Sequence, residues 1–230
     1  RIFGIAVFRQ KYDNFVTAVE LETRTVHTIS HDAGAIRSAT IIGGRYLITG
    51  GTDCSLRIWG LPGFILLRIS TIHSDQVIAV AGCMENGLVA SLDKHGLLII
   101  ETLRNGKFIC STEVQISSNT PLLLVFKSGL VVCADPASTA TQIAVFDTKL
   151  NKIASMEFEG KATELHKATD DLGGEFVIAC VNNTIYILEA LSLHTIVSYK
   201  VGSKTLHICP SRRKRELMCG IHDTIKFFVY

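Results

Sequence analysis

The stretch that decides the fold runs from residue 31 to residue 59 and reads HDAGAIRSATIIGGRYLITGGTDCSLRIW. It holds three short apolar segments, at 35–42, 45–49 and 56–59, and the last of them alternates apolar with polar side chains. A glycine pair separates the first two segments, and a Gly-Gly-Thr-Asp turn separates the last two. Short apolar runs divided by tight turns are typical of antiparallel strands. The stretch therefore predicts a β-meander of three strands.

The strand that closes this stretch recurs along the chain. Matching segments are SLRIW (55–59), LLIIE (97–101), QIAVF (142–146), IYIL (185–188) and IKFF (225–228). Their last residues follow one another at intervals of 42, 45, 42 and 40 residues. Other strand-like segments recur with them, so each unit reads as four short strands. Units of four strands and about 40–45 residues are typical of the blades of a β-propeller.

These repeats predict an all-β protein with one domain over residues 1–230. The first 30 residues fit the last three strands of a partial blade. Further blades are expected at about 31–70, 71–116, 117–160, 161–201 and 202–230. Five to six blades would make either part of a seven-bladed propeller or a smaller closed ring. The chain begins with Arg1 rather than Met, so we expect it to be a piece of a longer protein. A window of helical propensity, 164–171, is predicted to be a strand followed by a turn.

Four side chains of this stretch lie at defined places in the predicted meander. His31 precedes the first strand, Thr49 lies in the second, Asp53 in the turn and Trp59 at the end of the third. In their spacing the stretch resembles a WD40 repeat. The resemblance implies a structural tetrad, in which the aspartate accepts from the imidazole, the imidazole from the hydroxyl, and the hydroxyl bonds the indole N–H. The alternative is a hydrolase triad. We favour the tetrad because the hydroxyl lies in mid-strand and the chain has no nucleophile elbow.

The next unit carries a degenerate version of this set. His73 and Ser91 each lie 42 residues after their counterparts, and His95 stands where equal spacing places the aspartate. Asp93 is close by and would serve instead if the turn were shifted. Glu101 replaces the tryptophan. The later units hold no recognisable tetrad. The glycine pairs at 43–44 and 50–51 are predicted to be turn residues with positive φ.

Composition narrows the functional classes. The net charge is +2, from 23 basic and 21 acidic residues, which argues against a nucleic-acid-binding protein. No apolar run approaches the ~18 residues that span a bilayer, and no signal-peptide pattern is present. The seven cysteines form no CxxC pair and are predicted to be reduced in a cytoplasmic protein. Five of the eight histidines, at 31, 73, 95, 207 and 222, occupy repeat-related positions and lack the i, i+2 or i+4 spacing of metal ligands, so we expect no metal site. Without a phosphate-binding loop, we also expect no cofactor and no small-molecule substrate.

A basic run, Arg212, Arg213, Lys214 and Arg215, lies between two predicted strands. Three interpretations remain open for it. It is a solvated hairpin loop, a contact with an anionic membrane or an acidic partner, or a nuclear address. Near an anionic bilayer each cation would contribute roughly 1 kcal/mol.

The segment 95–109, HGLLIIETLRNGKFI, is similar to the C-terminal WD40 region of BEACH-domain (Beige-type) proteins. In that family a strand ends in Thr-Leu where most WD40 repeats have Trp-Asp. Five residues fit the family pattern: Thr102, Leu103, Arg104, Gly106 and Phe108. His95 and Glu101 depart from the Asp and His of that pattern.

The BEACH resemblance implies a non-catalytic scaffold in vesicle and lysosome-related membrane traffic, including autophagy. Its propeller would recruit partner proteins through its top face and loops, in the cytoplasm and peripherally on endomembranes. Two alternatives remain. The first is a WD40 subunit or substrate receptor of another assembly, such as a ubiquitin ligase, a coat or a signalling complex. The second is a propeller enzyme, for which the sequence offers no convergent set of carboxylates and histidines.

Overall fold

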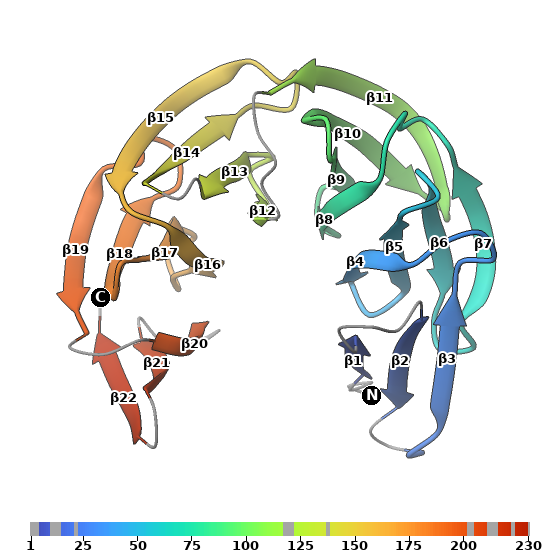
Figure 1. The fold of residues 1–230 in the computed structure, drawn as a ribbon, viewed down its shortest axis with the longest axis horizontal. Helices are drawn as coiled ribbons and strands as arrows, with labels where there is room; N and C mark the ends of the chain where they lie inside the picture. The colour runs from blue at the N-terminus through green and yellow to red at the C-terminus, as the bar shows by residue number, and fades with distance from the viewer. Residues whose placement is uncertain are drawn as a thin grey trace. The chain divides into compact units, whose positions relative to one another are not determined.

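The computed structural model of the chain describes residues 5–9, 15–20, 23–116, 122–136, 139–201, 205–210, 216–221 and 224–229. Within these ranges the regular secondary structure consists of β-strands (Figure 1). No helix long and apolar enough to cross a membrane lies in these ranges. The chain divides into two compact units, Arg1–Pro121 and Leu122–Tyr230. That residues 1–230 form a single domain stays a prediction.

Unit 1 contains three antiparallel sheets whose neighbouring strands are consecutive in the chain. The first has three described strands: β1 (Ile5–Arg9), β2 (Phe15–Glu20) and β3 (Val26–Ser30). The second has four: β4 (Ile36–Ile42), β5 (Tyr46–Gly51), β6 (Leu56–Gly60) and β7 (Ile65–Ser70). The third has four: β8 (Val77–Cys83), β9 (Leu88–Asp93), β10 (Leu97–Arg104) and β11 (Lys107–Gln115).

Unit 2 repeats this construction. Its first sheet consists of β12 (Leu122–Val125), β13 (Val131–Pro136), β14 (Ala140–Phe146) and β15 (Lys152–Glu159). The second consists of β16 (Ala162–Thr169), β17 (Glu175–Val181), β18 (Thr184–Glu189) and β19 (Thr195–Lys200). The third has the described strands β20 (Thr205–Pro210), β21 (Glu216–Ile221) and β22 (Thr224–Val229). The window 164–171, predicted as strand and turn, is β16 and the turn after it, and that prediction is confirmed.

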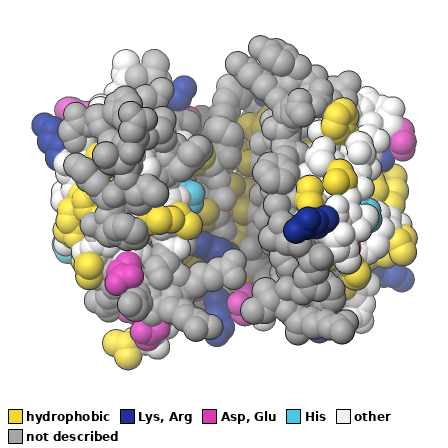
Figure 2. Space-filling view, turned by 90° about the horizontal axis from the view of Figure 1, so that it is seen from below, with side chains coloured by type: hydrophobic (Ala, Val, Ile, Leu, Met, Phe, Trp, Pro, Cys, Tyr) yellow, Lys and Arg dark blue, Asp and Glu magenta, His cyan; other side chains and the backbone are white. Residues whose placement is uncertain are grey.

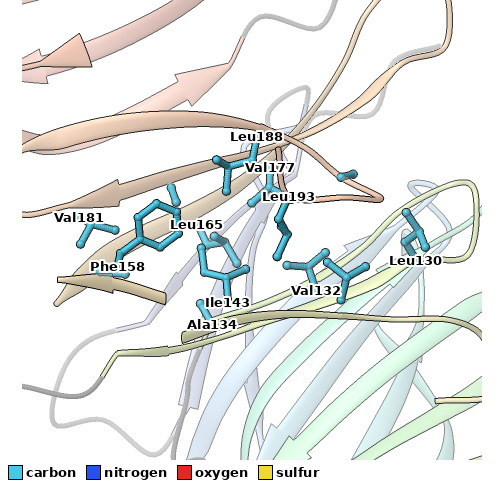
Figure 3. Packing of buried hydrophobic residues seen from close by; sticks show 14 of the residues in the cluster. Leu130, Val132, Ala134, Ile143, Phe158, Leu165, Val177, Val181, Leu188 and Leu193 are labelled. Atoms are coloured by element: carbon cyan, nitrogen blue, oxygen red, sulfur yellow. The ribbon is translucent and has the colours of Figure 1, made fainter. Parts of the chain in front are cut away.

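The core of each unit lies between the faces of successive sheets. In unit 2, Val132 and Ile143 of one sheet pack in the same cluster as Leu165, Val177 and Leu188 of the next. Figure 3 shows these side chains filling the space between the two sheets. Burying one such aliphatic side chain stabilises the fold by about 1.5–3 kcal/mol. The second strand of a sheet is covered on both faces, so β9 and β17 are buried along almost their whole length.

A register shift recurs between the third and fourth strands of the four-stranded sheets. It falls beside Trp59, Glu101, Phe146 and Leu188, the residues that mark the repeat in the sequence. In three of these sheets the shift leaves one extra residue on the outer strand. That residue is an exposed aliphatic each time: Leu67, Ile153 and Ile196. The period of the sequence therefore corresponds to a repeated β-bulge, which sets a common register for the outer strands.

The first strands of successive sheets are joined by a side chain that caps a backbone amide. Val80 N–H on β8 donates to Ser38 Oγ on β4 at 2.9 Å. Ile208 N–H on β20 donates to Glu164 Oε2 on β16 at 2.8 Å. Ser38 and Glu164 each follow the register shift in their own strand, so the two joints are equivalent. One such joint lies in each unit.

Substituting Ser38 with alanine is expected to remove this acceptor and lower the free energy of unfolding by about 1 kcal/mol. Urea unfolding followed by the fluorescence of Trp59, the one tryptophan of the chain, measures the effect in unit 1. The exposed Ser74 is the matched control, since its alanine variant should stay within about 0.5 kcal/mol of wild type. An equal loss in both variants would contradict a role for the joint.

Candidate functional site

The best-preserved polar cluster of the described chain lies in the sheet β4–β7. His31 precedes β4, Thr49 lies on β5, Asp53 lies in the following turn, and Trp59 lies on β6. His31 Nδ1 is 3.0 Å from Asp53 Oδ1, and its Nε2 is 2.8 Å from Thr49 Oγ1. Trp59 Nε1–H donates to Thr49 Oγ1 at 2.9 Å. The structure thus brings all four predicted tetrad residues into one hydrogen-bonded chain.

The direction of each hydrogen bond follows from the chemistry of the groups. A carboxylate only accepts, so the imidazole proton must lie on Nδ1 and point to Asp53. Nε2 of the neutral ring then accepts from the hydroxyl of Thr49, which in turn accepts from the indole of Trp59. Each of these donors and acceptors has a complementary partner, which is what burial of polar groups requires.

The ionisation of the pair is consistent with this arrangement. Burial lowers the pKa of His31, although the hydrogen bond and charge of Asp53 oppose that effect, so the ring stays neutral at neutral pH. Burial acts to raise the pKa of Asp53, but hydrogen bonds from His31 and Ser55 outweigh it and lower that pKa below its ordinary value. The Thr49 hydroxyl is fully buried. It is therefore closed to solvent, and its hydrogen bonds are made to His31 and Trp59 of the cluster.

Three further members of this cluster, Asp32, Ser55 and Arg57, were not predicted from the sequence. The Arg57 guanidinium is buried and donates to Asp53 Oδ2 at 3.2 Å and to Asp32 Oδ2 at 3.1 Å. The hydroxyl of Ser55 donates to Asp53 Oδ1 at 2.8 Å. Arg57 lies between two buried apolar residues on β6, the third strand of its sheet. A charge in that setting is a signal from which its buried partner could have been inferred.

The glycine pair at 50–51 has a different role from the one predicted. Gly43 and Gly44 have positive φ, as expected, but Gly50 and Gly51 belong to β5 and do not. A Cβ on Gly51 would lie 2.5 Å from His31 Nδ1. One on Gly50 would lie 2.5 Å from Val77 Cγ1. These two glycines are needed for close packing around the tetrad and against the next sheet, rather than for a turn.

The sheet β8–β11 keeps a shorter version of the cluster. His73 Nε2 is 2.8 Å from Ser91 Oγ, and His73 Nδ1 is 3.2 Å from Asp93 Oδ2. The prediction that His95 takes the position of the aspartate is wrong, because the His95 side chain is 77% exposed and faces Asp75 at 3.5 Å. β9 extends to Asp93, so the acid is the last residue of the strand and the turn comes after it. Equal spacing misassigned the position because it cannot register this shift.

Replacing Asp93 with alanine is expected to leave the buried His73 without its acceptor and to cost about 1–3 kcal/mol. The matched alanine variant of His95, in the same turn, should change stability by less than about 0.5 kcal/mol. Urea unfolding of both variants, monitored by Trp59 fluorescence, separates the two residues. A larger loss for the His95 variant would restore the assignment made by spacing.

In the sheet β8–β11, Glu101 takes the position that Trp59 has in the preceding sheet. Its residue is 4% exposed, and its Oε2 atom has no hydrogen-bond partner within the described residues. Burial raises the pKa of Glu101 to about 7, and the positive charge of Arg68 opposes that rise only in part. The second tetrad therefore has no indole donor, and the acid at that position is largely protonated below neutral pH.

The remaining predicted sites lie elsewhere. The basic run 212–215 falls outside the described residues. Six cysteine side chains are described, and none of these six forms a disulfide. Burial raises the pKa of Cys133 to about 12. Within the same part of the chain, no three His, Cys, Asp or Glu side chains gather closely enough to hold a metal ion.

Comparison with known proteins bears on the fold. No protein-family model matches the chain, and no curated protein matches it in sequence. Among solved structures, 1411 chains match, so the fold is widespread and does not itself point to one function. One of them is a chain of the crystal structure of the mitotic checkpoint complex. It is 11% identical and has a TM-score of 0.77, over 99% of this chain and 71% of that chain.

At that level of identity the likeness concerns the fold alone. Together with the antiparallel meanders and the recurring four-stranded sheets, it shows that the chain has a WD40-like β-propeller fold. The prediction of an all-β fold of this class is confirmed.

Proposed function

We propose that the chain is a non-catalytic protein-interaction module, the C-terminal propeller of a BEACH-type protein in vesicle and lysosomal membrane traffic. The observation that carries this proposal is the burial of the tetrad. The side chains that resemble a catalytic triad are hydrogen-bonded to one another, and His31 and Thr49 among them are buried. Binding then depends on the turns and outer strands that the sheets hold in place. Partner proteins would dock on the top face and loops, in the cytoplasm and peripherally on endomembranes.

The BEACH assignment is supported by the segment 95–109, whose family-like residues form one hairpin. β10 ends at Arg104, Asn105 and Gly106 make the turn with φ of 50° and 73°, and β11 begins at Lys107. A Cβ on Gly106 would lie 3.1 Å from Leu67 Cδ1 on β7 of the preceding sheet. The glycine of the motif is thus needed both for the turn and for close approach of two sheets.

Affinity capture of the full parent protein, against the same protein lacking residues 1–230, tests this proposal. A BEACH domain upstream and membrane-traffic partners that are lost on deletion are the expected results. Partners that remain after deletion would contradict a binding role for the chain. Turnover of any compound in a hydrolase substrate panel would contradict the absence of catalysis.

A second candidate is favoured by the likeness to a chain of the mitotic checkpoint complex. In it, the chain is a WD40 subunit or substrate receptor of another multiprotein assembly, such as a ubiquitin ligase, a coat or a signalling complex. An F-box or an α-solenoid in the parent, in place of a BEACH domain, would decide for this candidate.

Contact with anionic membranes is a further part of the proposal and rests on the charge of residues 212–215. Replacing all four with alanine should reduce co-sedimentation with phosphatidylserine-containing liposomes at low salt, since each cation contributes about 1 kcal/mol near such a surface. Liposomes of phosphatidylcholine alone are the control. Equal binding of wild type and variant would remove the membrane from the proposal.

A further inference from the structure

Strand β7 exposes large aliphatic side chains along its length. Ile65 is 67% exposed, Leu66 40%, Leu67 48% and Ile69 45%, and Ile72, just beyond the strand, is 42% exposed. β7 pairs with β6 on one side and ends its sheet on the other, so one edge of its backbone is unpaired within that sheet. Apolar edge strands tend to pair with other chains, and proteins usually protect them with charged side chains. Exposed apolar side chains also occur elsewhere on the surface (Figure 2), so exposure alone does not single out β7.

The equivalent outer strands of unit 2 show what is particular to β7. The bulge aligns Leu67 with Ile153 of β15 and Ile196 of β19, and all three are exposed. The residue before the bulge is Leu66 in β7, where the other two strands have Lys152 and Thr195. Two residues after the bulge is Ile69, where they have Ser155 and Ser198. β7 therefore has aliphatic side chains at positions that are polar in both equivalent strands.

The exposed side chains of β7 lie on both faces of the sheet. Successive residues of a strand point to opposite faces, and Ile65 and Leu66, like Arg68 and Ile69, are consecutive and exposed. A helix laid against one face would leave the other uncovered. A strand that pairs with the free edge brings side chains to both faces and satisfies the unpaired backbone groups as well. The geometry therefore favours an extended segment as the occupant.

Charge defines the chemistry of that segment. Arg68 is the one charged residue of β7 and is exposed. Among the described residues it forms no ion pair, and its charge acts on the buried Glu101. An exposed guanidinium between aliphatic side chains complements a carboxylate flanked by apolar residues, since opposite charges across a strand pair are stabilising.

We propose that the free edge of β7 binds an extended segment of a partner protein, in which β-branched or aliphatic residues flank an Asp or Glu that pairs with Arg68. The segment adds a fifth strand to the sheet β4–β7. This inference deepens the proposed function, because it rests on the chain being a binding module. It places one partner on the edge of a sheet rather than on the top face.

Selection of a phage-displayed library of random decapeptides on the 230-residue chain tests the proposal. Enriched peptides are expected to carry Asp or Glu between Val, Ile or Leu residues. Their affinity should fall about tenfold or more for the double variant Leu66→Thr/Ile69→Ser, and likewise for Arg68→Glu, which reverses the complementary charge. The double variant introduces residues that β19 already carries at these positions, so the fold should tolerate it. Ile196→Ser on β19, another exposed aliphatic, is the matched control and should leave the affinity unchanged.

Three outcomes would overturn the proposal. The first is that no peptide is enriched, and the second is that the enriched peptides bind all variants equally. The third is self-association of the chain at micromolar concentration that the double variant abolishes, which would make a second copy the occupant. The full parent protein with the double variant separates this inference from the proposed function. If it captures every partner of the wild type, the inference fails while the scaffold role stands.

Discussion

Replacing Asp53 with alanine is expected to lower the free energy of unfolding of unit 1 by about 3–5 kcal/mol. The cost is higher than the ~1–3 kcal/mol expected for an ordinary lost hydrogen bond, because Asp53 serves three partners at once. It accepts from the His31 ring, from Ser55 and from the buried guanidinium of Arg57. Its removal leaves Arg57 inside the unit with Asp32 as its remaining carboxylate partner among the described residues, and with its Nε atom already unpaired there.

Urea unfolding followed by Trp59 fluorescence is suited to this measurement, because the indole belongs to the tetrad itself. Asp32→Ala is the matched control. It removes the other carboxylate of Arg57, but the Asp32 side chain is 89% exposed, so its ion pair should contribute no more than about 1 kcal/mol. Similar losses in the two variants would mean that the buried network contributes little and that Asp53 acts as a surface charge.

The second large effect is expected at Glu101 and depends on pH. Burial raises the pKa of this carboxyl from its ordinary value of 4.5 to about 7. Below pH 4.5 the group is protonated in both the folded and the unfolded chain, so stability is unaffected by its ionisation. Between pH 4.5 and about 7 the unfolded chain has lost the proton while the folded chain still binds it, so stability falls as the pH rises. Above pH 7 the total loss in the free energy of unfolding is about 3 kcal/mol.

Glu101→Gln mimics the protonated acid at every pH. The variant should match wild type near pH 5 and exceed its free energy of unfolding by about 2–3 kcal/mol at pH 8. Urea unfolding at pH 5, 6, 7 and 8 measures the difference between the two proteins. That difference is the quantity to compare, because burial lowers the pKa of His31 and His73, which makes both proteins lose stability toward acid pH. Glu157→Gln, at an exposed position of β15, should leave the wild-type profile unchanged. A constant difference across this pH range would show that Glu101 is ionised in the folded chain.

Much of the fold could be predicted because its signal is periodic. The strand ending at Trp59 recurs at nearly constant intervals, and each recurrence falls in the third described strand of a sheet. The same periodicity predicted that the window 164–171 is a strand and turn, against its local helical propensity. Register within each sheet follows from the alternation of side chains once the turns are located.

The candidate site could be predicted where spacing within a single hairpin carried the information. Thr49, Asp53 and Trp59 lie within one hairpin, and the structure brings them to His31 at hydrogen-bonding distance. The same spacing failed in the sheet β8–β11, where β9 extends to Asp93 before the turn begins. Residue counting treats every turn as equal in length. The hydrogen bond to the buried His73 ring is made by Asp93, because the backbone places that carboxylate within reach.

Some properties of this protein are determined by the local sequence, as in the stretch 31–59, and others only by the tertiary structure. Strand periodicity, the repeat and the members of the first tetrad are local in the chain, and the sequence carries them because turns and alternation act over a few residues. The ionisation of Glu101, the burial of Arg57, the close packing at Gly50 and Gly51 and the apolar edge of β7 depend on neighbouring strands and sheets. Those properties are set by which surfaces lose contact with water, and only packing of the folded chain decides that.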